Sequence, residues 1–281
     1  MLTRFAPAPT GWMHLGHVLN AEHVWGFGAT VLLRIEDHDR ERCRPEYEAG
    51  ILEDLEWLGY RPDSPMVRQS ERNAIYRESV EILAKQGLVY GCDCTRKEIE
   101  AWSARREARR STAEAREIRY TGRCRDRGLP LTEGLGWRVR MDPGVETFAD
   151  GILGSQAQDP SQPCGDVLVR DRLGNWTYQF AVSVDDFRQG IDLVIRGEDL
   201  LPSTGRQIRL ARLLGREPPA AFRHHPLIMK HPGQKLSKSD GDTGIRDLRA
   251  QGWTPEQVKA AARTSSAQTI SATDEHGTTQ T

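Results

Sequence analysis

The chain has 281 residues, with 39 basic and 40 acidic side chains and 37% hydrophobic residues, which is ordinary for a globular protein of one large or two smaller domains. The balanced charge gives no indication of a nucleic-acid partner. The sequence has neither a signal-peptide pattern nor an apolar stretch long enough to cross a bilayer. We therefore expect a soluble, cytoplasmic protein without a membrane partner. We also expect a monomer, although nothing in the sequence determines the oligomeric state.

The first ninety residues alternate between strand and helix patterns. Residues 2–6 predict a short strand, residues 15–27 a helix, and the apolar run at 30–35 a buried parallel strand. Pro45 opens an amphipathic helix, and a further helix is expected over about residues 72–86. This alternation predicts an α/β fold with a Rossmann-type doubly wound parallel sheet.

The pattern changes after residue 90. Cysteines, an arginine-rich segment and the short apolar stretches of an antiparallel unit occur there, and the α/β pattern returns afterwards with a helix over about residues 203–214. A last helix is expected around residues 255–263. We therefore divide the chain into a split Rossmann-type domain (1–90 and 166–230), a connective insertion (91–165), a loop with a helical segment (231–263), and a tail (264–281). The small polar residues of the tail predict disorder.

The arginine-rich segment from Arg105 to Arg125 is expected to form a helix. Its arginines are interspersed with glutamates, which is typical of a solvated helix face. The same residues would also suit a patch that follows an RNA backbone. Both interpretations stay open.

The motif His14-Leu15-Gly16-His17 stands where the first strand gives way to a helix. The free N–H groups and the dipole of a helix start favour phosphate. Two imidazoles there would donate hydrogen bonds to phosphate oxygens, and Gly16 would let a flat base or sugar approach the backbone. Taken alone, the motif is more typical of two surface histidines at a helix start.

The motif Lys235-Leu236-Ser237-Lys238-Ser239 follows a loop that contains Pro232 and Gly233. Lysine is scarce in this chain, so two lysines three residues apart indicate a role for a compact, flexible ammonium group. A mobile loop of this kind would bring the ammonium groups onto a polyphosphate. Taken alone, the segment also fits a solvated basic turn.

Four blocks of the sequence together carry a family resemblance: RFAPAPTGWMHLGH, VLLRIEDHDRER, IRGEDLLPSTGRQ and HHPLIMKHPGQKLSKS. In this order they resemble the class I glutamyl-tRNA synthetase family over about residues 2–250, with HLGH similar to the HIGH signature and KLSKS similar to KMSKS. The resemblance implies a class I catalytic domain that activates L-glutamate with ATP and Mg²⁺. It implies ATP binding by His14, Gly16, His17 and Lys238, and catalytic roles for His14, His17, Lys235 and Lys238.

The same resemblance implies a glutamate pocket. Two carboxylates and one ammonium group call for two cationic forks and one anion, and Arg4, Arg196 and Glu36 in the matched blocks have those charges. Tyr178 is similar to a family tyrosine that contacts the amino acid. The remaining implied residues continue the first block: Phe5, Ala6, Pro7 and Ala8. The family usually has Ser where this chain has Ala8, so one side-chain hydrogen bond would be missing and only the backbone would serve.

Three of the five cysteines, Cys92, Cys94 and Cys124, lie in one region. An odd number in a chain of this size does not indicate a disulfide framework. The spacing alone predicts three thiolate ligands with the fourth position open, or three cysteines without a special role. Similarity to the short paralogues of the family adds Tyr120 as the fourth ligand and implies one structural Zn²⁺ per chain.

The reaction itself depends on which branch of the family the chain resembles. Full-length members continue past KMSKS with a helical anticodon-binding part, whereas this sequence stops soon after KLSKS. We therefore expect a short paralogue that activates glutamate without tRNA and transfers it to the queuosine base at the wobble position of tRNA(Asp). Two alternatives stay open: an ordinary glutamyl-tRNA synthetase catalytic domain lacking its anticodon part, and a non-catalytic RNA-binding protein with the synthetase fold.

Overall fold

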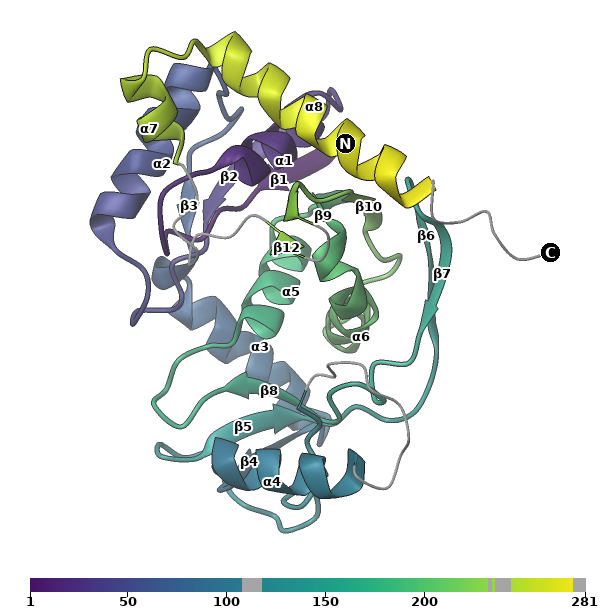
Figure 1. Cartoon of the computed structure of the whole chain (residues 1–281). Coiled ribbons are helices and arrows are strands. Elements are labelled where there is room, and N and C mark those ends of the chain that lie inside the picture. Colours follow the sequence, from purple (N-terminus) through teal and green to yellow (C-terminus); the bar gives the residue numbers. More distant parts are fainter. Residues whose placement is uncertain (108–117, 232–233, 236–243, 275–281) are drawn as a thin grey trace, which may run out of the picture.

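The computed structural model describes residues 1–107, 118–231, 234–235 and 244–274 (Figure 1). Its first elements are β1 (Leu2–Phe5), α1 (Leu15–Trp25), β2 (Thr30–Ile35), α2 (Pro45–Leu58), β3 (Val67–Arg68), a 3₁₀ turn η1 (Gln69–Glu71), α3 (Asn73–Lys85), β4 (Val89–Cys92) and α4 (Arg96–Glu107). The next are β5 (Gly136–Val139), β6 (Glu146–Asp150), β7 (Gly154–Gln158), β8 (Val167–Arg170), α5 (Tyr178–Arg188), β9 (Leu193–Gly197), η2 (Glu198–Ser203), α6 (Thr204–Leu213) and β10 (Ala221–His225). The last are β11 (Met229–His231), β12 (Gln234–Lys235), α7 (Ile245–Ala250) and α8 (Pro255–Asp274).

A parallel sheet forms the centre of the molecule. Strands β1, β2 and β3 pair in parallel in that order, and β9 pairs in parallel with β10. Strand β9 lies on the other side of β1, where the Thr3 hydroxyl donates to the Leu193 carbonyl at 2.8 Å. The chain therefore reverses its direction of winding between β1 and β9, as in a doubly wound sheet. The predicted α/β class with a parallel sheet is confirmed.

Apolar helix faces cover this sheet. One core cluster joins β1, β2 and β9 to α1, α2, α7 and α8, through residues such as Phe5, Val18, Leu55 and Val258. A second cluster joins α3, α5 and α6 to a smaller sheet, through residues such as Tyr76, Val169 and Phe180. Strands β2 and β9 are buried along almost their whole length, as expected for parallel strands that are covered on both faces, and this explains their unbroken apolar runs. No helix in the described part of the chain is long and apolar enough to span a membrane.

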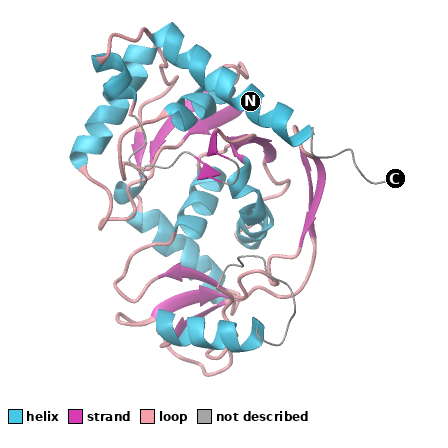
Figure 2. Cartoon of the chain, in the orientation of Figure 1, coloured by secondary structure: helices cyan, strands magenta, loops and turns pink. Residues whose placement is uncertain are grey.

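The smaller sheet is antiparallel and consists of β4, β5 and β8 (Figure 2, lower strands). Strands β6 and β7 lie between β5 and β8 in the sequence, yet they extend the main sheet beside β10. Strand pairing therefore crosses both expected boundaries of the insertion at residues 91 and 165. Val167 and Val169 of β8 pack on the α5 side of the second core cluster, which holds β8 in the smaller sheet. The domain division itself stays a prediction.

The last helix is longer than the sequence analysis predicted. Helix α8 continues to Asp274, so residues 264–274 of the expected disordered tail are helical, while residues 275–281 lie outside the described part. No Gly or Pro occurs between Pro255 and Gly277 to stop the helix. Val258 and Ala262 anchor its first half in the core, and Arg263 forms an ion pair with Glu22 of α1. Tertiary packing thus outweighs the polar composition.

The arginine-rich segment is also different from its prediction. Helix α4 is described as far as Glu107, so residues 105–107 are helical as predicted. Residues 108–117 lie outside the described part, and residues 118–125 form turns and extended chain rather than a helix. Gly122 has a φ of 84°, which a helix does not contain. Here the backbone N–H of Cys124 donates to the Tyr120 hydroxyl at 2.8 Å, so a local side-chain contact replaces helical hydrogen bonding.

Candidate active site and metal centre

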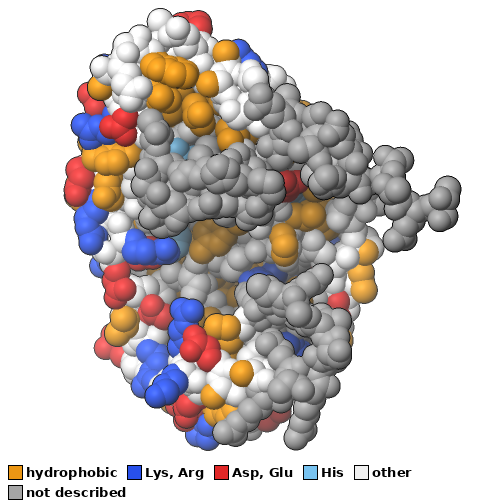
Figure 3. Space-filling view, viewed as in Figure 1, with side chains coloured by type: hydrophobic (Ala, Val, Ile, Leu, Met, Phe, Trp, Pro, Cys, Tyr) orange, Lys and Arg blue, Asp and Glu red, His pale blue; other side chains and the backbone are white. Residues whose placement is uncertain are grey.

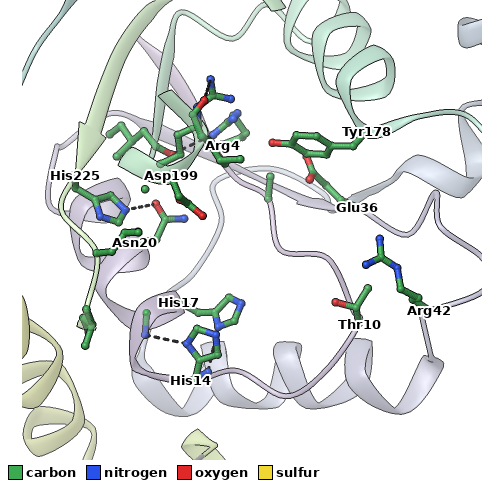
Figure 4. Close-up of a pocket in the computed structure, with 18 residues that line it drawn as sticks. Arg4, Thr10, His14, His17, Asn20, Glu36, Arg42, Tyr178, Asp199 and His225 are labelled. Carbon is green, nitrogen blue, oxygen red and sulfur yellow. Dashed lines mark hydrogen bonds between the residues drawn. The ribbon is translucent and has the colours of Figure 1, made fainter. Parts of the chain in front are cut away.

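A cavity of about 580 Å³ opens at the carboxyl ends of β1, β2 and β9, beside the start of α1 (Figure 4). This is the position at which doubly wound sheets bind ligands. Of the residues predicted from the sequence, the structure places the following around it: Arg4, Ala6, His14, Gly16, His17, Glu36, Tyr178 and Arg196. They come from four separate blocks of the chain, so the fold brings the main predicted residues together.

Other predicted residues lie elsewhere. The side chain of Phe5 is buried in the core beneath β1, because it points to the face opposite Arg4. Pro7 supports the site from behind, since its carbonyl accepts the backbone N–H of Glu36 at 3.0 Å, and the Ala8 carbonyl accepts that of Thr10. Lys235 is placed only as a backbone position in the β11–β12 hairpin, and Lys238 lies outside the described residues.

The two histidines of HLGH close the start of helix α1. Gly16 N–H donates to Nδ1 of His14 at 3.1 Å, and His14 N–H donates to Nδ1 of His17 at 3.1 Å. Because both Nδ1 atoms accept, the neutral tautomer that fits these contacts carries its proton on Nε2. A Cβ atom on Gly16 would lie 2.9 Å from Cε1 of His14, so glycine is needed here for the histidine cap itself.

Four buried charged groups form a compact cluster behind the cavity. Asp186 accepts from Arg4 Nε at 3.0 Å and from Arg34 at 2.7 Å, and Arg34 also donates to Glu36 at 3.0 Å. Burial alone would raise the pKa of Asp186, but the charges and hydrogen bonds of Arg4 and Arg34 hold that pKa below its usual range. The cluster contains two cations and two anions, so its charge is balanced before any ligand enters.

Arg196 is a buried cation of a different kind. Its guanidinium donates to Gln207 at 2.6 Å, to the Thr204 hydroxyl at 2.9 Å and to Nε2 of His224 at 3.0 Å, all of which are neutral acceptors. Within the described residues, no carboxylate forms an ion pair with it. Burial lowers the pKa of Arg196. A cation held rigidly at a cavity without an anion is a site for a carboxylate or phosphate ligand.

His224 orients Arg196 and was not found from the sequence. Its Nδ1 lies 2.6 Å from a carboxylate oxygen of Asp150. Burial and the neighbouring Arg196 charge lower the pKa of His224, although Asp150 acts in the opposite direction. The ring is therefore neutral at neutral pH, with Nδ1–H donating to Asp150 and Nε2 accepting from Arg196. Asp150 thus fixes the tautomer of His224, and that tautomer supplies the Nε2 acceptor that orients the Arg196 guanidinium.

Tyr178 and the rim residues complete the cavity. Tyr178 opens helix α5 and lies beside Glu36 in Figure 4; burial and the Glu36 charge raise the pKa of its hydroxyl, so it stays protonated. On the opposite side, Oδ1 of Asn20 lies 3.1 Å from Nε2 of His225, whose pKa burial lowers to about 4. Asn20 lies one turn after His17 on α1, a spacing that would have identified it from the sequence.

A second group of predicted residues forms a separate cluster between α4 and the smaller sheet. The sulfur atoms of Cys92, Cys94 and Cys124 lie within 4.8 Å of one another, and those of Cys94 and Cys124 are 3.4 Å apart. The Tyr120 hydroxyl lies 3.5 Å from the Cys92 sulfur. All four side chains are buried, and the cysteines form no disulfide. The cluster has the ligand atoms needed to hold a metal ion.

Comparison with known proteins gives a family match and several similar proteins. Residues 1–273 match the family model described as "tRNA synthetases class I (E and Q), catalytic domain". The chain is 39% identical to a glutamyl-Q tRNA(Asp) synthetase of Rhodobacter capsulatus, over 92% of this chain and 98% of that protein. It is 44% identical to a protein of the same name from Bordetella bronchiseptica, over 85% of this chain and 75% of the other.

Solved structures agree with the family match. A glutamate tRNA ligase from Elizabethkingia meningosepticum, crystallised with its amino acid, superimposes with a TM-score of 0.71 at 34% identity. The match covers 86% of this chain and 52% of the other, so the chain spans about half the length of that ligase.

The balanced charge cluster generates a stability prediction. Asp186→Asn should lower the free energy of unfolding by about 3–5 kcal/mol, because Arg4 and Arg34 would stay buried without the carboxylate that both contact. Equilibrium urea unfolding measures this change. Asp126→Asn is the matched control, since Asp126 is 87% exposed and its ion pair with Arg140 contributes at most about 1 kcal/mol. Equal losses in the two variants would contradict the prediction.

Proposed function

The chain belongs to the catalytic-domain family of the class I tRNA synthetases for glutamate and glutamine, which are ligases, and we propose that it transfers L-glutamate to the queuosine base of tRNA(Asp). Relatives that carry the name glutamyl-Q tRNA(Asp) synthetase support this acceptor, and one of them aligns over nearly its whole length. ATP activates the glutamate first, without tRNA. Glutamate, ATP and tRNA are all cytoplasmic molecules, which supports a cytoplasmic enzyme.

Arg196 is the observation that carries the amino-acid assignment. Its guanidinium is buried, fixed by neutral groups, and without a carboxylate partner among the described residues. Arg4, by contrast, already contacts Asp186. We therefore assign the γ-carboxylate of glutamate to Arg196, and the ammonium group to Glu36 with Tyr178 beside it. Arg4 faces the same cavity and complements the remaining carboxylate.

ATP would enter from the α1 side of the cavity. His14 and His17, with the N-terminus of α1, would donate hydrogen bonds to its phosphates, while Lys235 and Lys238 would add positive charge as the transition state forms. A glutamate α-carboxylate oxygen attacks the α-phosphorus, the bond to the β-phosphate oxygen breaks, and pyrophosphate leaves. Mg²⁺ bound with ATP would neutralise phosphate charge. The chain's own contribution is alignment and charge complementarity.

Transfer completes the reaction. A hydroxyl of the queuosine ring attacks the carbonyl carbon of glutamyl-adenylate, an ester bond forms, and the bond to the AMP phosphate oxygen breaks. AMP leaves, and its phosphate takes up the hydroxyl proton. No side chain of the protein becomes covalently attached in either step.

We also propose that the cysteine cluster holds one structural Zn²⁺ within the connective insertion. At a zinc–sulfur distance of about 2.3 Å, tetrahedral geometry requires sulfur atoms about 3.8 Å apart. The Cys94 and Cys124 sulfurs are 3.4 Å apart, and the Tyr120 oxygen lies 3.5 Å from the Cys92 sulfur and 4.0 Å from the Cys94 sulfur, so the cluster would need to expand only slightly to surround an ion. Burial raises the pKa of the Tyr120 hydroxyl, so its ionisation needs a cation at the cluster.

An ordinary glutamyl-tRNA synthetase activity is the second candidate. It is favoured by the solved glutamate tRNA ligases that share this fold. The two candidates differ in the tRNA that accepts glutamate and in whether tRNA is needed for activation.

The function predicts two measurable reactions. The purified protein should exchange pyrophosphate into ATP with glutamate and no tRNA, and should attach labelled glutamate to tRNA(Asp) carrying queuosine. The same tRNA with guanosine at the wobble position is the control and should stay unlabelled. Exchange that requires tRNA, together with charging of tRNA(Glu), would instead support the ordinary synthetase. If no exchange occurs either with or without tRNA, the protein does not catalyse glutamate activation.

Arg196 predicts the amino-acid preference. Wild-type exchange should be at least about a hundredfold weaker in kcat/KM with glutamine, because glutamine would leave a buried guanidinium without its anion. Arg196→Ala should lower exchange with glutamate and narrow the difference between the two amino acids. Arg4→Ala is the comparison, and it should lower activity without narrowing the difference. If the difference between glutamate and glutamine narrows only in Arg4→Ala, then Arg4 and not Arg196 binds the γ-carboxylate. If it narrows in neither variant, neither arginine binds that carboxylate.

The metal proposal predicts about one zinc ion per purified chain. Cys92→Ser should release zinc and lower the melting temperature, because thiolate–metal bonds contribute directly to folding. Cys43→Ser is the matched control, since Cys43 lies outside the cluster. Metal analysis of protein grown with ample zinc decides the question, and zinc-free wild-type protein would end the proposal. Full zinc retention in Tyr120→Phe would remove only the tyrosine from the ligand set.

A further inference from the structure

A second cavity, of about 890 Å³, adjoins the active-site cavity and has Tyr178 as a shared wall residue. Its size is within the range of pockets that enclose a ligand as large as a nucleoside. Cys92, Cys94 and Tyr120 of the metal centre form part of another wall. Its charged residues have both signs, including Glu41, Asp166, Arg138 and Arg172, which suits an uncharged group with hydrogen-bonding edges.

A rigid turn stands at the rim of this cavity. The carboxylate of Asp171 accepts backbone N–H groups of Leu173 at 2.9 Å and Asn175 at 2.8 Å, and Gly174 has a φ of 92°. These contacts hold the Leu173 side chain 78% exposed at the tip of the turn. An apolar side chain presented to solvent by a fixed backbone can pack against the flat face of a nucleobase.

A third cavity, of about 240 Å³, lies on the other side of Leu173. Its ionisable lining residues are all basic: His38, Arg40, Arg77 and Arg170. Arg40 and Arg77 are exposed and form no ion pair with any described residue. Arg170 is held beneath the turn, where it donates to the Gly174 carbonyl at 3.1 Å and stacks 4.4 Å over Trp137.

Several observations make this third cavity complementary to an anion. The first turn of α3, which contributes Asn73, contains no acidic residue. His38 lies between the third cavity and the active site, with its ring centroid 6.3 Å from that of Tyr178. On the face shown in Figure 3, Lys and Arg side chains lie among Asp and Glu side chains at the lower left, the region where the chain passes from β8 to α5 in Figure 1.

We infer that the third cavity binds a backbone phosphate of the RNA next to the acceptor nucleotide, with the acceptor base in the second cavity and Leu173 packed against it. This inference rests on the proposed function for the identity of the acceptor. The three cavities form a series, since Tyr178 is shared by the first two and Leu173 by the last two. A base in the middle cavity therefore lies between the activated glutamate and its own phosphodiester chain.

The test separates RNA binding from activation. Arg40→Ala, Arg77→Ala and the double variant should raise the Kd for tRNA(Asp) about three- to tenfold per arginine at low salt. They should also reduce the slope of log affinity against log salt by about 0.7 for each lost contact with single-stranded RNA. Glutamate-dependent exchange without tRNA should be unchanged. Arg61→Ala is the matched control, because Arg61 is an exposed arginine near the opposite end of β2 and outside the three cavities.

Leu173→Ser provides an independent measurement. It should lower kcat/KM for transfer at least about threefold and leave the salt slope unchanged, since no charge is lost. A double arginine variant with wild-type affinity and slope would overturn the phosphate site. Equal effects in Arg61→Ala would also overturn it, because they would reflect net charge alone. If the wild type binds tRNA(Asp) but does not transfer glutamate to queuosine, the proposed function fails, and the salt slopes still decide this inference.

Discussion

Burial of positive charge at the carboxyl ends of three parallel strands is the constraint on which the rest of the site depends. Arg4, Arg34 and Arg196 are all buried there, and each must meet an anion or a full set of acceptors. Asp186 and Glu36 satisfy the first two. Arg196 receives only neutral partners, so the free protein retains a fixed cation that a carboxylate ligand can neutralise.

This difference in pairing gives the buried charges two roles: the Asp186 cluster holds other side chains in position, and Arg196 is available to a ligand. The charges of the Asp186 cluster are balanced in the free protein, so the cluster can hold Arg4 and Glu36 in place without a substrate. Arg196 is instead positioned by a chain of two hydrogen bonds. Asp150 orients the His224 ring, and Nε2 of that ring accepts from the Arg196 guanidinium. The strand ends therefore combine a cluster whose charges balance, around Asp186, with one guanidinium, that of Arg196, which lies at the cavity without a carboxylate partner among the described residues.

The sequence located the residues that line the cavity better than the residues that hold them in position. Arg4, Glu36, Tyr178 and Arg196 lie in short blocks that could be matched one by one, and the structure brings all four to one cavity. Asp186 and His224 were missed because their partners are 182 and 74 positions away in the chain, a relation that no local pattern contains.

Secondary structure was predicted well where apolar periodicity was strong, as in β2 and α2, and poorly where tertiary contacts decide. Helix α8 extends to Asp274 through polar residues because its beginning is anchored against α1. The Tyr120–Cys124 segment leaves the expected helix because its side chains converge on Cys92 and Cys94. In both cases the deciding neighbour is distant in sequence, and composition gives the wrong answer.

If the cysteine cluster holds a metal ion as proposed, its position in the wall of the second cavity has a thermodynamic consequence. Any ligand that fills this cavity more tightly when the cysteine cluster is metal-loaded must raise the metal affinity by the same factor, since coupling between two sites is reciprocal. The acceptor RNA would then protect the metal from chelators, and metal depletion would impair acceptance of glutamate while leaving its activation intact. Metal binding to the cysteine cluster and RNA binding in the second cavity would then be thermodynamically coupled, so metal supply would affect the extent of RNA modification.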